Sequence, residues 1–293
     1  MLGISLYKNK INFIRTSKLN NNNLSVTHYG TYKYENLNKV ISCSLKDIIK
    51  KENITTEKSV SIVLDSQFCL FNEIFCEDPQ SLDFHNNLSG NSGINSYLDS
   101  YYYPISFRDD HYMGIHIDKN LKQQVVESID KLGFSIRSIN VGIFSADKLA
   151  SSVFNARSLD NYLLVRFITS SALEILYTNN GLPSVYGRYN IVNKKIKSLK
   201  VIGNRSDEQN VKLAIDQILK GRKSLSNINR AFVYQSSGHS QIVKNLINKK
   251  QRDVVLLNLF NYKNLKNNNK NIATTMNHVT FSDLGQLFGG INV

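Results

Sequence analysis

Cysteine is scarce in this sequence, and its three copies are poorly placed for a common structural role. Cys43, Cys69 and Cys76 show no CxxC spacing, and an odd number of thiols cannot pair off completely. A disulfide framework or a structural zinc site is therefore not expected. Such cysteine usage is typical of a reducing compartment, so we expect a cytoplasmic protein without a resident metal.

Long apolar runs are also missing. No run approaches the roughly 20 residues that a bilayer-spanning helix needs. The first residues, MLGISLYKNK, lack the basic region followed by an apolar stretch that is typical of a secretory leader. We expect a protein that is soluble or bound at a membrane surface.

The common catalytic motifs do not occur. The sequence has no GxxxxGK(S/T), no GxSxG, and no GxGxxG after a predicted strand. His111 and His116 lie near three aspartates, but side chains five residues apart on a strand point to opposite faces, and Asp118 is better placed as a helix cap. We therefore expect no metal site and no catalytic residue.

Acidic residues are outnumbered, and the formal net charge is +13 with a pI of about 9.5. Such an excess favours nucleic acid or an anionic membrane surface as a partner. However, the lysines are scattered among asparagines, as an AT-rich coding bias would produce, and no nucleic-acid-binding motif accompanies them. Nucleic acid is therefore not an expected partner. A basic nucleic-acid-binding protein is kept as a less favoured hypothesis, after the two that are stated at the end of this section.

The first half predicts a meander of three strands, a helix and further strands. The composition becomes more polar from Glu77, and we expect an inserted α+β unit between Glu77 and Asn140. It includes a helix from Lys119 to Leu132, which Asp118 caps and Gly133 ends. The other predicted elements are strands at Leu2–Tyr7, Ile11–Thr16, Leu24–Tyr32, Val60–Leu64, Phe68–Phe75, Ser100–Ile105, His111–Ile117 and Ser135–Val141, and helices at Ser44–Lys51, with Ser44 as N-cap, and Ser145–Asn155.

The second half predicts a similar order of elements without repeating the residues. A hairpin and a third strand occupy Leu163 to Val192. They are followed by a strand at Ile196–Ile202, a helix at Asp207–Leu219, a strand at Ala231–Gln235, a helix at Ser240–Asn248, a fully buried strand at Val254–Phe260 and a loop at Lys263–Lys270.

Arg166 is the most informative single residue. It lies in LLVRFITSSALEIL, inside a strand whose two faces are both apolar. A buried guanidinium needs acceptors, because an unpaired buried charge is costly. We expect Arg166 to bond to backbone carbonyls or to a carboxylate across a cleft, or else to hold a phosphate directly.

A module of three strands, a helix and a strand that occurs twice, with a unit inserted in the first copy, resembles the actin/hexokinase ATPase superfamily. Within it the chain looks most like the PilM-type pilus assembly proteins, which are related to the division protein FtsA. The resemblance implies a duplicated α/β, ribonuclease-H-like fold. Its lobes would be residues 1–158 and 159–293, with an α+β subdomain inserted at about 77–140 and a C-terminal segment, 275–293, packing back on the first lobe.

The nucleotide motifs of that superfamily are degenerate here. Ser5 and Tyr7 replace the aspartate and glycine of the first phosphate loop, and Arg166 and Ile168 replace those of the second. A cation in place of a metal-binding carboxylate repels magnesium, and tyrosine adds bulk where backbone must approach phosphate. In the adenosine motif, QSSGHSQIVKNL, Ser237 is a milder departure and Gly238 is retained. We expect no cofactor, and ATP binding is disfavoured.

The resemblance implies a non-catalytic cytoplasmic scaffold, a pseudo-ATPase, in a type IV pilus or related secretion machine. Its relatives bind the N-terminal cytoplasmic tail of an inner-membrane protein and assemble into rings, so the chain would act peripherally at the inner membrane. The main alternative is a divergent ATPase or sugar-kinase-like enzyme that uses another acid, for which Asp65 is the candidate. The residues expected to line the partner groove are Phe68, Leu70, Phe71, Tyr101, Tyr103 and Phe107.

Overall fold

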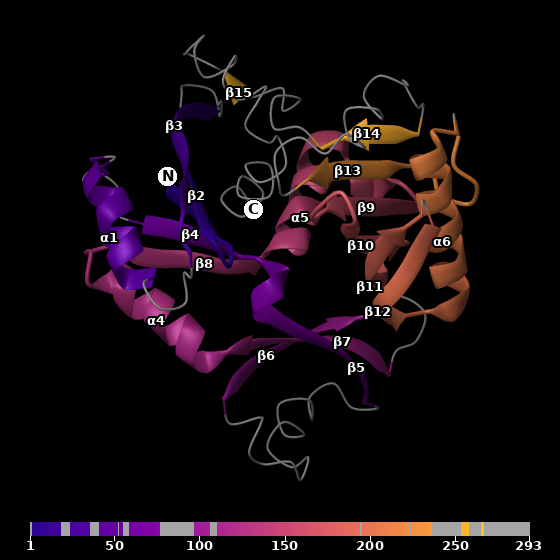
Figure 1. Cartoon of the computed structure of the whole chain (residues 1–293), viewed down its shortest axis with the longest axis horizontal. Helices are drawn as coiled ribbons and strands as arrows, with labels where there is room; N and C mark the ends of the chain where they lie inside the picture. The colour runs from indigo at the N-terminus through magenta and orange to yellow at the C-terminus, as the bar shows by residue number, and fades with distance from the viewer. Residues whose placement is uncertain are drawn as a thin grey trace.

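The fold consists of two six-stranded sheets that lie side by side, with a three-stranded sheet beneath them (Figure 1). The computed structural model describes residues 2–18, 24–35, 41–51, 53–54, 59–76, 97–105, 110–193, 195–222, 224–235, 253–257 and 265–266. Within these residues no helix is long and apolar enough to cross a membrane.

The first sheet has the strand order β15-β3-β2-β1-β4-β8. β1 pairs antiparallel with β2 and parallel with β4, so the chain crosses over between them through a helix. All five residues of β1 are buried, as expected for a strand covered on both faces. The strands are β1 (Leu2–Leu6), β2 (Lys10–Lys18), β3 (Leu24–Lys33), β4 (Ser59–Leu64), β8 (Ser135–Val141) and β15 (Leu265–Lys266). β15 lies within the stretch expected to be a loop.

Two helices, α1 (Ile41–Lys51) and α4 (Lys119–Asp130), cover the outer side of the first sheet (Figure 1). The prediction that Ser44 caps the first helix is wrong. The helix already begins at Ile41, and Ser44 lies inside it with its side chain buried. Ile41 and Leu45 form a buried stripe at helical spacing that starts before Ser44, and this packing extends the helix toward its N-terminus.

The second sheet has the strand order β12-β11-β10-β9-β13-β14. The first sheet contains the order β3-β2-β1-β4-β8, and the second contains β11-β10-β9-β13-β14. In each, three consecutive antiparallel strands are followed by two parallel strands on the side of the first strand. The duplication expected from the sequence is therefore present in the topology. The elements are β9 (Asn161–Phe167), β10 (Ala172–Asn179), β11 (Leu182–Val192), β12 (Lys195–Gly203), α6 (Arg205–Lys220), β13 (Ala231–Gln235) and β14 (Val254–Leu256).

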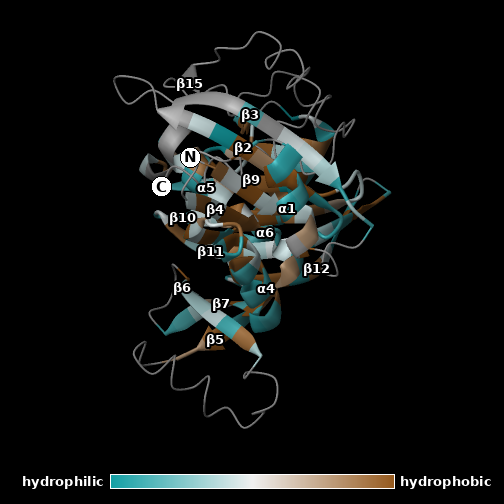
Figure 2. Cartoon of the chain, turned by 90° about the vertical axis from the view of Figure 1, so that its left-hand side faces the viewer, coloured by the Kyte–Doolittle hydropathy of each residue, from teal (hydrophilic) through white to brown (hydrophobic). Residues whose placement is uncertain are grey.

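Helix α5 (Gly142–Phe154) lies between the two large sheets and contacts strands of both (Figure 1). It begins three residues before the predicted start and ends at Asn155, which takes a left-handed conformation with φ 51°. One buried cluster runs from Ile4 and Ile62 of the first sheet to Leu164 and Tyr186 of the second. The lobes therefore share apolar core, and in Figure 2 the strands at the centre of the molecule are mainly hydrophobic.

The third sheet has the order β5-β7-β6, with strands β5 (Cys69–Phe75), β6 (Leu98–Pro104) and β7 (His111–Asp118). This corrects the contents of the inserted unit expected at about 77–140. β5 precedes that range yet belongs to the small sheet, whereas β8 pairs with β4 and α4 packs on α1. The amino-acid composition becomes more polar at Glu77, but composition does not show which sheet a strand joins, because strand pairing is non-local.

Two further expectations concern the end of the chain. The predicted strand Val254–Phe260 is three described residues long and half-buried, because β14 is an edge strand with β13 as its only neighbour in the described sheet. The predicted helix Ser240–Asn248 and the segment 275–293 lie outside the described residues, so the structure does not test them.

The cap of α4 generates the first prediction. Both Asn120 and Leu121 donate their backbone N–H groups to Asp118 Oδ1, at 2.7 and 3.1 Å. We expect Asp118→Ala to lower the free energy of unfolding by about 1 kcal/mol, measured by urea denaturation. Asp130→Ala is the control, because it removes an acid from the other end of the same helix, where a negative charge does not help. Equal losses in the two variants would contradict the capping role.

Candidate functional site: an ion-pair cluster between the lobes

The site lies along a row of laterally paired residues that crosses five strands of the second sheet. Register places Tyr234 beside Arg166, Arg166 beside Glu174, Glu174 beside Arg188, and Arg188 beside Lys200. Residues paired in this way point to the same face of a sheet. Charged side chains therefore line this row from the buried centre of the sheet to its exposed edge, on the face turned toward the first lobe.

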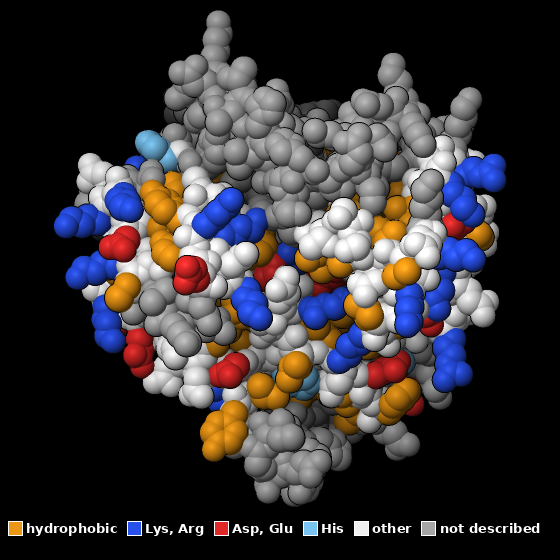
Figure 3. All heavy atoms as spheres, in the orientation of Figure 1, with side chains coloured by type: hydrophobic (Ala, Val, Ile, Leu, Met, Phe, Trp, Pro, Cys, Tyr) orange, Lys and Arg blue, Asp and Glu red, His pale blue; other side chains and the backbone are white. Residues whose placement is uncertain are grey.

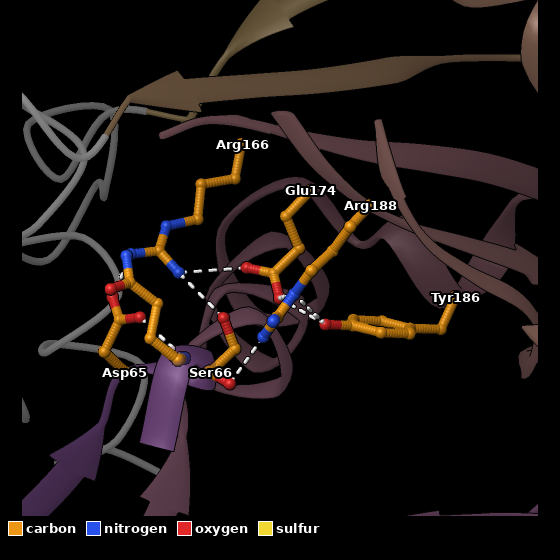
Figure 4. Close-up of polar contacts among 7 residues, drawn as sticks. Asp65, Ser66, Arg166, Glu174, Tyr186 and Arg188 are labelled. Carbon is orange, nitrogen blue, oxygen red and sulfur yellow. Dashed lines mark hydrogen bonds and ion pairs between the residues drawn. The ribbon is translucent and has the colours of Figure 1, made fainter. Parts of the chain in front are cut away.

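Arg166 is fully buried, and its guanidinium joins the two lobes (Figure 4). Nη2 donates to Asp65 Oδ2, which follows β4 of the first lobe. Nη1 donates to Glu174 Oε2 on the neighbouring strand at 2.9 Å and to Ser66 Oγ at 3.2 Å. The expectation that Arg166 reaches a carboxylate across the cleft is confirmed.

A second arginine extends the contact. Arg188 Nη2 donates to the backbone carbonyl of Ser66 at 2.5 Å, and its Nε donates to the Tyr186 hydroxyl at 2.9 Å. That hydroxyl in turn donates to Glu174 Oε1 at 2.7 Å. The Tyr186 ring stacks on Phe71 with centroids 4.1 Å apart. Figure 4 shows Asp65 and Ser66 approaching from the first lobe and the labelled Arg166, Glu174, Tyr186 and Arg188 from the second.

The cluster balances its charges, with two arginines facing two carboxylates. Burial by itself lowers the pKa of the Arg166 guanidinium, but the negative charges of Asp65 and Glu174 outweigh burial and raise the pKa well above its usual value. Burial, and then Glu174, likewise raise the pKa of Tyr186. Arg166 is therefore always charged and Tyr186 always neutral in the physiological range, so the cluster is a fixed set of donors and acceptors.

The four residues expected at phosphate-loop positions lie in the last part of β1 and β9 or directly after these strands. Ser5 and Tyr7 are buried, and the guanidinium of Arg166 lies 5.8 Å from the centre of the Tyr7 ring. Tyr7 donates its backbone N–H to Lys10 at 2.9 Å, which closes the β1–β2 turn. Ile168 directly follows the strand that carries Arg166, and it donates its backbone N–H to the Ala172 carbonyl at 2.9 Å. Ser237 and Gly238 lie outside the described residues.

Asp65, the acid that an enzymatic reading would use, is fully buried and already engaged. Its Oδ2 accepts from Arg166, and its Oδ1 accepts the backbone N–H of Gln67 at 2.9 Å. Both carboxylate oxygens thus already accept hydrogen bonds from the protein, which leaves less room for a metal ion or a substrate. Among the described residues, no group of three or more His, Cys, Asp or Glu side chains could hold a metal ion.

Glu174 is the site residue that sequence reasoning missed. It lies eight residues after Arg166, and the Thr169–Ser171 turn between the strands brings the two into register. A buried acid in an apolar strand, opposite a buried arginine in the preceding strand, was the available signal. It could be used only once the turn position was known.

The six residues expected to line a partner groove do not form one surface. Phe71 is 2% exposed and packs on Tyr186, so it belongs to the core between the lobes. Phe68 is half-buried against the core. Leu70 is exposed but alternates with Phe71 along β5, so it lies on the opposite face. Phe107 lies outside the described residues.

Tyr101 and Tyr103, in contrast, are both about two-fifths exposed and share one face of β6. The Tyr103 ring stacks on Phe144 of α5 with centroids 4.9 Å apart. Lys122 of α4 donates to the Tyr101 hydroxyl at 3.0 Å and pairs with Asp99 at 2.5 Å. These four residues, Tyr101, Tyr103, Lys122 and Phe144, form the aromatic junction, where the small sheet meets the helices of the first lobe.

The two neighbouring histidines follow the expected alternation along β7. His111 lies 2.6 Å from Glu73 and stacks on Phe75, whereas His116 contacts Ser100 at 2.7 Å and Asn72 at 2.6 Å. Burial, and then the charge of Lys200, lower the pKa of His116. The two rings thus belong to separate polar contacts rather than to one site.

No protein-family model and no curated protein sequence matches the chain. Among solved structures, it is similar to a PilM–PilN type IV pilus biogenesis complex, with a TM-score of 0.62 and 10% identity over 100% of this chain and 98% of that chain. It is also similar to a Bacteroides thetaiotaomicron protein with an actin-like ATPase fold and unknown function, with a TM-score of 0.46 and 14% identity over 87% and 89% of the two chains.

A third similar structure is the cytoplasmic domain of EpsL, an inner-membrane component of the type II secretion system of Vibrio cholerae, with a TM-score of 0.47 and 10% identity over 99% and 93% of the two chains. At 10% identity, the similarity to the PilM–PilN structure establishes the fold alone. The chain has a PilM-like, actin-like ATPase fold, which confirms the fold class expected from the sequence.

The ion-pair cluster generates the second prediction. Arg166→Met leaves Asp65 and Glu174 buried without their cation, so it should lower the free energy of unfolding by about 3–5 kcal/mol in urea denaturation. The triple variant Arg166→Met, Asp65→Asn, Glu174→Gln removes every one of these charges and should recover a large part of the loss. Arg188→Met is the control, because its side chain is 27% exposed and should cost less. A triple variant no more stable than Arg166→Met would contradict the pairing.

Proposed function

We propose that this protein, which has a PilM-like, actin-like ATPase fold, is a non-catalytic scaffold in a pilus or secretion-type assembly machine. The observation that carries the proposal is the bond from Arg166 to Asp65, which occupies the space between the lobes with the protein's own charges. Members of this fold that hydrolyse ATP need metal-neutralised phosphates and a free acid there. The same fold supports many functions, so the proposal depends on this site and not on the fold alone.

The first consequence concerns nucleotide. The resemblance to the superfamily implies that Arg166 and Tyr7 replace residues that hold magnesium and approach the phosphates, and Arg166 is already paired with two carboxylates. Bringing in Mg-ATP would require breaking a buried ion pair, at a cost of several kcal/mol.

Calorimetric titration with Mg-ATP tests this consequence on the full chain. We expect no binding heat up to millimolar nucleotide, with or without magnesium. Micromolar binding that depends on magnesium would support the alternative of a divergent ATPase or sugar-kinase-like enzyme, and would contradict the scaffold proposal.

The second consequence concerns the partner. We place its binding site at the aromatic junction and not on the full set of six residues expected from the sequence. Tyr101 and Tyr103 offer partly exposed rings on β6, which is an edge strand within the described part of the small sheet. An extended peptide can add to such an edge through its backbone while its side chains contact the rings.

The partner that fits this proposal is an inner-membrane protein with a cytoplasmic tail. The similar PilM structure is a complex with PilN, and EpsL is itself an inner-membrane component, so both are consistent with it. The scaffold would then work on the cytoplasmic side of the inner membrane, beside its partner.

Site-specific photo-crosslinking in the native cell tests the partner site. A benzoylphenylalanine in place of Tyr101 should crosslink to a segment of a single-span membrane protein on its cytoplasmic side. The same probe in place of Leu213, which is comparably exposed on α6, is the control and should not form this adduct. An adduct from position 213 and none from position 101 would overturn the assignment.

A further inference from the structure

The β11–β12 hairpin has an unusual charge composition. Residues 175–206 contain no aspartate or glutamate, although the chain as a whole has 23 acids to 36 basic residues. The same stretch carries six basic residues, namely Arg188, Lys194, Lys195, Lys197, Lys200 and Arg205. This stretch thus carries a formal charge of +6 out of +13 for the whole chain, although Arg188 is already paired with Glu174 in the ion-pair cluster.

Strand register gathers these charges on one face. Val192 pairs with Lys195, Asn190 with Lys197, and Arg188 with Lys200. Because Arg188, Asn190 and Val192 alternate along β11, they and their partners point to the same side of the hairpin. The residues between them, including Ile191 and Ile196, pack toward α6 on the other side. We call the set Val192, Lys195, Lys197 and Lys200 the basic hairpin face, and leave out Arg188 because it belongs to the ion-pair cluster.

The lysines of this face are exposed, and apolar side chains are exposed beside them. Val192 is 52% exposed, and Leu199, in the bulge between Lys197 and Lys200, is 59% exposed. Figure 3 shows Lys and Arg side chains over the second lobe around β11 and β12, with hydrophobic side chains and some acidic ones between them. A flat surface of lysines and aliphatic groups is typical of contact with a bilayer interface.

Lysines on the helices have a different environment. Lys131, Lys212 and Lys220 each lie within 4 Å of a carboxylate four residues earlier, on Glu127, Glu208 and Asp216 respectively. Those pairs are locally neutral. The basic hairpin face thus differs from the general positive charge of the chain, because its own strands supply no acid.

We propose that the basic hairpin face binds the anionic phospholipid headgroups of a membrane. Lysine side chains attract such headgroups electrostatically, and Val192 and Leu199 can enter the interface between them. Nucleic acid fits less well, because the tyrosines of the hairpin, Tyr186 and Tyr189, are buried and offer no ring for stacking bases. Lysines on an edge strand also disfavour the addition of a partner strand.

Membrane binding by the basic hairpin face does not depend on the proposed protein partner or on whether nucleotide binds between the lobes. It follows from charge and exposure on the second lobe, whereas the partner site lies at the aromatic junction of the first. Vesicle binding with purified protein contains no partner, so the two proposals can fail separately.

Sedimentation with vesicles tests the proposal on the full chain. We expect the protein to bind vesicles of phosphatidylcholine with about 30% phosphatidylglycerol, and to bind pure phosphatidylcholine weakly. The variant Lys195→Gln, Lys197→Gln, Lys200→Gln should lose affinity on the order of 100-fold, since each lysine near an anionic surface contributes about fivefold. Leu199→Ser should lose several-fold if the apolar contact takes part.

The matched control is Lys131→Gln, Lys212→Gln, Lys220→Gln, which removes the same charge from helix surfaces. It should bind within about threefold of the unchanged protein. Equal losses in both triple variants would show a general charge effect and overturn the assignment, as would an unchanged protein that does not bind anionic vesicles. Loss of single-stranded DNA binding in the hairpin variant, with vesicle binding unaffected, would assign the face to nucleic acid instead. Thermal unfolding of each variant checks that the fold is intact.

Discussion

A buried guanidinium that must be neutralised is the constraint on which this structure depends. Arg166 lies in the central strand of the second sheet, and it can be charged there only if carboxylates approach it from both sides. Glu174 comes from the adjacent strand, and Asp65 comes from the end of β4 in the other lobe. The requirement for charge balance therefore holds the two lobes together, in addition to the apolar core that they share.

The same constraint connects the fold to its proposed role. In nucleotide-dependent members of an actin-like fold, a ligand between the lobes can change their relative position. Here an internal ion pair between Arg166 and Asp65 joins the two lobes, and Phe71 of the small sheet stacks on Tyr186 of the second lobe. All three sheets are thus tied around one cluster. Under the proposed scaffold role, these contacts would hold the lobes in one arrangement while the protein presents surfaces to partners.

Much of this arrangement could be predicted from the sequence, because the necessary signals are local. Apolar residues on both faces of β9 indicated a central strand, and the cost of a lone buried charge predicted an acceptor for Arg166. The signals failed where pairing is non-local. Nothing near Phe71 shows that it packs on Tyr186, more than a hundred residues away, and nothing in β5 shows that it leaves the first sheet for the small one. The prediction that Ser44 is an N-cap is wrong because serine is a good capping residue by type, whereas the start of the helix is set by the buried stripe that begins at Ile41.

The distance between the lobes, measured with and without nucleotide, tests the central claim most directly. Cys43 is an exposed native thiol on α1, while Cys69 and Cys76 are buried, so a Leu213→Cys substitution on α6 completes a pair of spin labels across the two lobes. Pulsed electron resonance should give a single distance distribution that Mg-ATP does not change. A distribution that shifts or narrows when Mg-ATP is added would show that nucleotide, and not Arg166, controls the closure of the lobes.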